Sequence, residues 1–60
     1  MMFIKLTEAP NVVYVNAKYI TKIKAGNNCS WVYTMDHEVA FVREDAETIM
    51  KMLSTDDEIL

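Results

Sequence analysis

Hydrophobic and polar positions alternate along the first two thirds of the chain with the period of a β-strand. In residues 2–7, Ile4 and Leu6 fall on one face of such a strand while Phe3 and Lys5 fall on the other. Further runs rich in β-branched and aromatic residues follow at 12–15, 20–24, 30–35 and 38–42. Short connections between consecutive strands favour antiparallel neighbours, so the pattern predicts a small five-stranded antiparallel meander.

The residues between these runs predict how the strands are connected. Asn16 followed by good helix formers predicts a single helical turn, capped by Asn16, before the third strand. Ile20 and Ile23 are both expected to point inward, which a regular strand does not allow, so we expect a β-bulge between them. Turns are expected at 8–11, 26–28 and 36–37.

The last third of the chain changes to the period of an α-helix. Asp45 is expected to cap a helix over residues 45–53, with Ala46, Ile49, Met50 and Leu53 forming one apolar stripe. Residues 54–60 are expected to be an acidic tail. The fold class is therefore mainly β (α+β), as a single domain over residues 1–53, either a meander or a partly closed barrel of SH3-like scale.

Sixty residues bury only a small core, so the stability of the fold is expected to be marginal without a disulfide, a bound metal or self-association. Cys29 is the only cysteine and His37 the only histidine, so neither an intrachain disulfide nor a closed zinc set is expected. We expect no cofactor and no metal, and a lone thiol favours a reducing, cytoplasmic location. No apolar run approaches the length of a membrane-spanning helix, so we expect no membrane insertion.

Catalysis is not expected from this chain. The acid–imidazole–acid sequence of Asp36, His37 and Glu38 places neighbouring side chains on opposite faces of a strand or in a solvated turn. Cys29 and His37 have no third group to orient them and no oxyanion donor nearby in the pattern. We therefore expect a protein that is not an enzyme.

Several of the expected strands are apolar on both faces, which in a tiny domain indicates barrel closure or an interface with another protein. Trp31, Tyr33 and Phe41 are expected to supply packing for the helix, with some large side chains left exposed. We expect a protein-interaction or accessory module that works as a homo-oligomer or bound to a larger protein. The expected interaction surface consists of Phe3, Val13, Tyr14, Tyr19, Lys22, Lys24, Trp31 and Tyr33.

Weak binding of nucleic acid is the alternative. Lys22 and Lys24 share a strand face next to Trp31 or Tyr33, which could stack on bases. The net charge is −3 and the pI about 4.8, and both disfavour binding to phosphates. The charge is uneven, because residues 1–43 carry five basic and three acidic side chains, whereas residues 44–60 carry one basic and six acidic.

The order of these segments resembles a known family. Ile4-Lys5-Leu6-Thr7, then Val13-Tyr14-Val15-Asn16, then Tyr19-Ile20 and Ile23, and finally residues 39–44 followed by Ile49 and Leu53, are similar to the small flagellar and swarming-motility proteins (FlbD/SwrD-like). The resemblance implies an accessory role without catalytic residues. The chain departs from that pattern at residues 8–11 and 36–37, where the family has glycine turns. The strand–strand–helix ending also resembles, more faintly, the core of LytTR-type DNA-binding domains, and a phage-borne protein of similar shape fits the same pattern.

Overall fold

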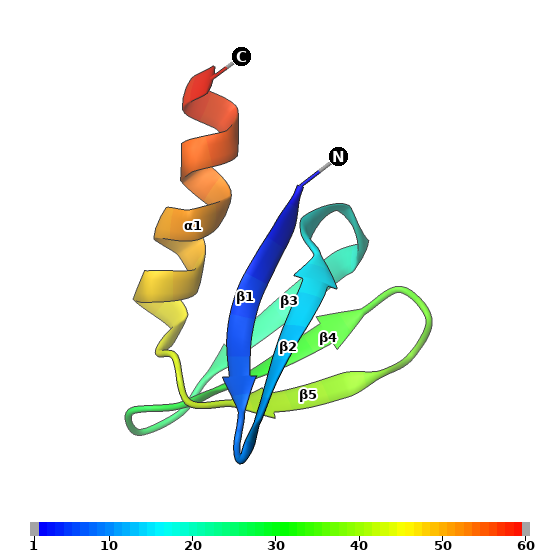
Figure 1. The fold of residues 1–60 in the computed structure, drawn as a ribbon, viewed down its shortest axis with the longest axis vertical. Helices are drawn as coiled ribbons and strands as arrows, with labels where there is room; N and C mark the ends of the chain where they lie inside the picture. The colour runs from blue at the N-terminus through cyan, green and yellow to red at the C-terminus, as the bar shows by residue number, and fades with distance from the viewer. Residues whose placement is uncertain (1, 60) are drawn as a thin grey trace.

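The computed structural model describes the backbone of residues 2–59 and the side chains of residues 2–54. It contains five strands, a short 3₁₀ helix and one α-helix (Figure 1). The elements are β1 (Phe3–Glu8), β2 (Asn11–Asn16), η1 (Ala17–Tyr19), β3 (Ile20–Ala25), β4 (Ser30–Thr34), β5 (Val39–Val42) and α1 (Ala46–Ile59). The five antiparallel strands and the single C-terminal helix confirm the expected mainly-β fold. The helix begins one residue after Asp45 and continues to Ile59, through most of the segment expected to be a tail.

The strands form two separate antiparallel sheets, a β1–β2 hairpin and a β3–β4–β5 meander. The expectation of one five-stranded meander is therefore wrong, and the sheets do not close into a barrel. The separation occurs at η1, where the Asn16 side chain accepts a hydrogen bond from the Lys18 amide at 3.0 Å, as expected for a capped turn. This turn breaks the extended backbone between β2 and β3, so these two consecutive strands do not pair.

Individual hydrogen bonds, rather than a continuous ladder, join the two sheets. The Arg43 amide, directly after β5, donates to the Thr7 carbonyl of β1 at 2.9 Å. At the end of β5, the Glu44 carboxylate accepts from both the amide and the hydroxyl of Thr7, at 2.8 and 2.9 Å. These bonds fix the far end of β1 to the segment that leads into α1.

The connections largely follow the sequence. The register of β3 against β4 shifts between Ile20 and Lys22, which confirms the expected bulge, and Ile20 and Ile23 both pack against the core. Positive φ angles occur at Asn28 and His37, in the two expected turns that flank β4. The β1–β2 turn contains a cis Ala9–Pro10 peptide bond.

The buried core draws on both sheets and the helix. Its fully buried side chains are Ile4, Leu6, Val32, Val42 and Ile49. Met52 and Leu53 pack against this cluster, whereas Met50 is 51% exposed. The expected stripe is therefore wrong at Met50, because the helix presents the face that contains Ile49, Met52 and Leu53 to the core.

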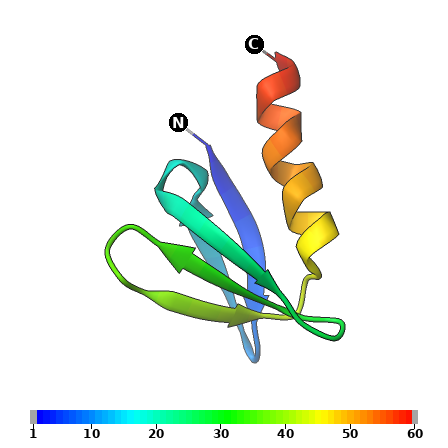
Figure 2. The same cartoon turned by 180° about the vertical axis from the view of Figure 1, so that it is seen from behind.

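The position of α1 leaves one side of the molecule open. The helix lies beside β1 and contacts β3, and β2 lies on the far side of β1 from it (Figures 1 and 2). Met52 accordingly borders a shallow surface pocket together with Met2 and residues 3–5 of the β1 strand. Packing by α1 thus covers the side of the sheets that β1 and β3 form.

Candidate interaction surface

The strand register places two rows of side chains across the outer face of the three-stranded sheet. Lys24, Trp31 and Phe41 lie opposite one another in one row. Lys22, Tyr33 and Val39 form the next row. The alternating positions Ile23, Val32 and Ala40 form a row on the inner face. We call the six outward side chains the lysine–aromatic face.

Contacts within the lysine–aromatic face order its side chains. The Lys22 ammonium lies 4.5 Å from the centre of the Tyr33 ring, and the Lys24 ammonium lies 5.5 Å from the Trp31 ring. Both distances are within the range of cation–π attraction. The Trp31 and Phe41 rings are 5.2 Å apart and tilted by 45°, a favourable arrangement for aromatic pairs.

Gly26 makes room for the Trp31 ring. A Cβ atom at this position would lie 2.7 Å from Cζ3 of Trp31 and 2.6 Å from the Cys29 sulfur. The only glycine in the chain therefore stands where the indole crosses the β3–β4 connection. Its function at this site is to leave space, since its φ is not positive.

Two members of this face were not among the expected interaction residues. Phe41 is 52% exposed and Val39 is 50% exposed. The expectation that Trp31, Tyr33 and Phe41 pack under the helix is wrong, because Val32 and Ala40 occupy the inner positions between them. Both faces of β4 are apolar, so the sequence does not indicate which of them points inward.

The eight residues expected to form one surface lie in separate places. Lys22, Lys24, Trp31 and Tyr33 come together on the lysine–aromatic face. Phe3 and Tyr14 lie on the outer face of the hairpin, 53% and 65% exposed. Tyr19 is exposed on η1, and Val13 is half-buried and packs against the core.

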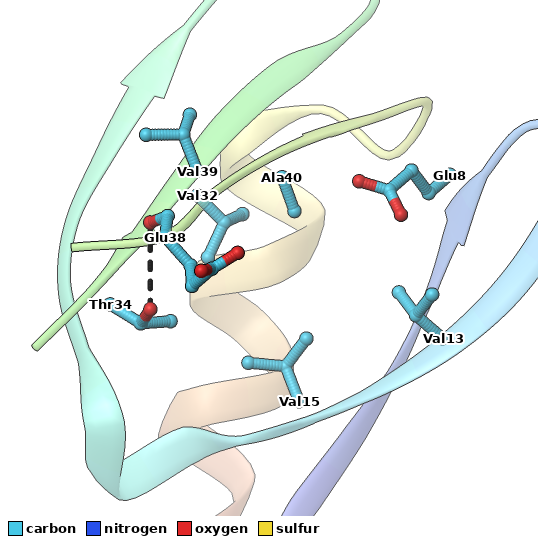
Figure 3. Close-up of a pocket in the computed structure, with 8 residues that line it drawn as sticks. All are labelled: Glu8, Val13, Val15, Val32, Thr34, Glu38, Val39 and Ala40. Atoms are coloured by element: carbon cyan, nitrogen blue, oxygen red, sulfur yellow. Dashed lines mark hydrogen bonds between the residues drawn. The ribbon is translucent and has the colours of Figure 1, made fainter. Parts of the chain in front are cut away.

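A pocket of about 180 Å³ opens on the side of the molecule away from α1. Its apolar lining comes from β2, β4 and β5, as Figure 3 shows. The residues around it are Glu8, Val13, Val15, Val32, Thr34, Glu38, Val39 and Ala40. Glu8 and Glu38 are the two charged residues among them, and both are acidic.

Hydrogen bonds lower the pKa of acids near the connections. The Thr34 hydroxyl donates to the Asp36 carboxylate and lowers the pKa of Asp36. Burial raises the pKa of Glu44, but the hydrogen bonds from the Thr7 amide and hydroxyl outweigh burial and hold this pKa below its ordinary value. Both acids are therefore carboxylates at neutral pH.

The arrangement of the titratable side chains does not assemble a reactive centre. Cys29 and His37 lie in the connections at opposite ends of β4, so they do not meet. Across the described side chains, no group of three or more histidine, cysteine or acidic residues is positioned to hold a metal ion. Within the same part of the chain, no helix has the length and apolar character needed to cross a membrane.

Comparison of the chain with protein-family models, with curated proteins and with solved structures finds no match in any of the three.

Proposed function

We propose that this chain is a small, non-enzymatic protein-interaction module that acts as a homo-oligomer or bound to a larger protein. Its SH3-like scale and the resemblance to small flagellar and swarming-motility proteins support an accessory role in the cytoplasm. The observation that carries the proposal is the lysine–aromatic face, where Phe41 and Val39 are half-exposed beside Trp31.

The composition of the face matches that of protein interfaces. Tryptophan and tyrosine dominate binding energy in interface centres, and a ring pair such as Trp31–Phe41 offers a large apolar area. Because Lys22 and Lys24 already contact the rings, fewer side chains must be ordered on binding, which lowers the entropic cost of association. The two ammonium groups favour a partner surface that carries acidic groups at its rim.

Two phenylalanines of nearly equal exposure supply a matched experiment. Phe41→Ser removes a ring from the lysine–aromatic face, whereas Phe3→Ser removes one from the hairpin. If the chain is a homo-oligomer, sedimentation equilibrium at micromolar concentration detects self-association that Phe41→Ser abolishes and Phe3→Ser leaves unchanged.

A monomeric wild type directs the test to a larger partner. A photo-crosslinking amino acid at position 41 is then expected to trap a discrete protein in the cells of origin, and the same group at position 3 is not. A monomer that gives no more crosslinked product from position 41 than from position 3 contradicts the proposal.

Binding of nucleic acid is the second candidate, favoured by the placement of Lys22 and Lys24 beside Tyr33 and Trp31 on one face. The net charge of −3 opposes it. Since Trp31 is the only tryptophan, its fluorescence reports directly on this face. Quenching by a single-stranded oligonucleotide that weakens steeply with salt would favour this candidate, and unchanged fluorescence at low salt would exclude it.

A further inference from the structure

The pocket between β2 and β5 carries an inference that rests on a different set of side chains from the lysine–aromatic face, with Val39 the one residue that the two share. We infer that it binds an extended segment of a partner protein, with one branched aliphatic side chain in the pocket and lysine or arginine residues on either side of it. Three features of the pocket support this assignment: its size, the edges of the strands around it, and its charge.

The pocket has the size and lining for one aliphatic side chain. Its volume of about 180 Å³ is below that of sites for cofactors and other larger ligands, which begin at roughly 300 Å³. A dry apolar cavity of about 150 Å³ accepts a single benzene-sized group. Val13, Val15 and Val32 line the interior (Figure 3), so the group that fits is apolar and branched or aromatic rather than charged.

The strands on either side of the pocket have edges that can pair with an extended segment. Within the described residues, β2 pairs only with β1, and β5 pairs only with β4. The second edge of β2 has no ladder partner, and the second edge of β5 is bonded to β1 just beyond its last residue, where the Arg43 amide donates to the Thr7 carbonyl. Such edges bind extended segments by strand addition. An added strand would place every second side chain toward the pocket.

The charge of the rim selects the flanking residues. Glu8 and Glu38 line the pocket, and no basic side chain does. Asp36 adds a third acid nearby, since the Thr34 hydroxyl that lines the pocket donates to its carboxylate. An acidic rim around an apolar interior is complementary to an aliphatic side chain with a basic residue on each side.

The period of a strand defines the probe for this site. In the blocked peptide Lys-Thr-Val-Thr-Lys, the valine and both lysines lie on the same face of an extended chain. The matched control Glu-Thr-Val-Thr-Glu has the same apolar residue and the opposite charge. Titration into the ¹⁵N-labelled protein is expected to shift the amide resonances of Val13, Val15 and Ala40, with binding in the millimolar range for so short a peptide. The acidic peptide is expected to leave them unchanged.

Substitutions at the rim separate charge recognition from folding. Glu8→Gln with Glu38→Gln is expected to weaken binding about fivefold, as for two solvent-exposed ion pairs. Glu47→Gln, on the exposed face of α1, removes a charge away from the pocket and is expected to leave binding unchanged. Well-dispersed amide resonances confirm that each variant is folded.

Three results would overturn the inference. They are no shifts at the pocket amides, equal binding of the acidic peptide, or shifts at the same amides that arise from protein concentration alone. The last result would show that a second copy of the chain occupies the pocket. Phe41→Ser is expected to bind the peptide like wild type, so failure of the proposed function and failure of this inference are distinguishable.

Discussion

Two methionines on α1 offer a direct test of how the helix sits against the sheets. Met52 packs against the core, whereas Met50, two residues earlier, is 51% exposed. Met50→Ala and Met52→Ala truncate the same side chain and change helix propensity by the same amount. The difference between their free energies of unfolding therefore isolates packing.

The expected magnitude follows from the groups removed. Truncation deletes Cγ, Sδ and Cε, and each methylene-sized group contributes about 0.8 kcal/mol when fully buried. Met52 is partly buried, so Met52→Ala is expected to cost about 1–1.5 kcal/mol. Met50→Ala is expected to remain within about 0.5 kcal/mol of wild type. A difference of about 1 kcal/mol corresponds to about 4–8 °C in Tm for a domain of this size.

Urea denaturation monitored by Trp31 fluorescence measures both variants at one protein concentration. Equal m values are needed, because they show that the compactness of the unfolded chain is unchanged. Ile49→Ala gives an upper reference, since this fully buried residue is expected to cost about 2–5 kcal/mol. If Met50→Ala costs as much as Met52→Ala, the helix does not present the face described above and the reasoning is refuted.

Three further predictions concern single sites. Glu44→Gln is expected to cost about 1 kcal/mol at pH 7, because a neutral amide is a weaker acceptor for Thr7. The pKa of Glu44 is lowered in the folded state, so the ionised carboxylate stabilises the fold above its ordinary pKa of 4.5, and this stabilisation is lost as the pH falls through the folded-state pKa. The difference in unfolding free energy between wild type and Glu44→Gln should therefore shrink on acidification. A difference that grows would contradict the prediction. Gly26→Ala is expected to displace the Trp31 ring, seen as a shifted emission maximum, while circular dichroism stays unchanged. Ser30→Ala is expected to leave stability unchanged or raise it by up to about 1 kcal/mol in thermal melts, because the buried Ser30 hydroxyl has no hydrogen-bond partner among the residues that the structure describes. A clear loss of stability would show that this hydroxyl is satisfied.

Local features of the fold could be predicted because they depend on neighbouring residues alone. The Asn16 cap, the bulge after Ile20 and the positive φ at Asn28 each follow from the preferences of a few adjacent residues. The lack of pairing between β2 and β3 could not be predicted in the same way. Whether these strands pair depends on the direction of the chain after η1, and the pattern of apolar positions does not specify that direction.

The choice between two apolar faces also depends on tertiary structure. On β4, Val32 points inward and Trp31 outward, although both are apolar. An inner row of Ile23, Val32 and Ala40 carries smaller side chains than the outer row, which suits the interior between a hairpin, a three-stranded sheet and a helix. For the same reason, the sequence did not predict that Phe41 lies on the surface. For Met50, the stripe spacing allowed either neighbouring helix face, and packing against the core places Met52 and Leu53 inward beside Ile49.

The absence of a ladder between the two sheets has a consequence for folding cooperativity. In a continuous sheet, backbone hydrogen bonds couple each strand to the next, but here the hairpin meets the meander mainly through side chains. The fully buried apolar side chains that join the three units are Leu6 of the hairpin, Val32 and Val42 of the meander, and Ile49 of the helix. The all-or-none character of unfolding is thus a property of this small cluster, and truncating Leu6 would let the hairpin and the meander lose their structure in separate steps.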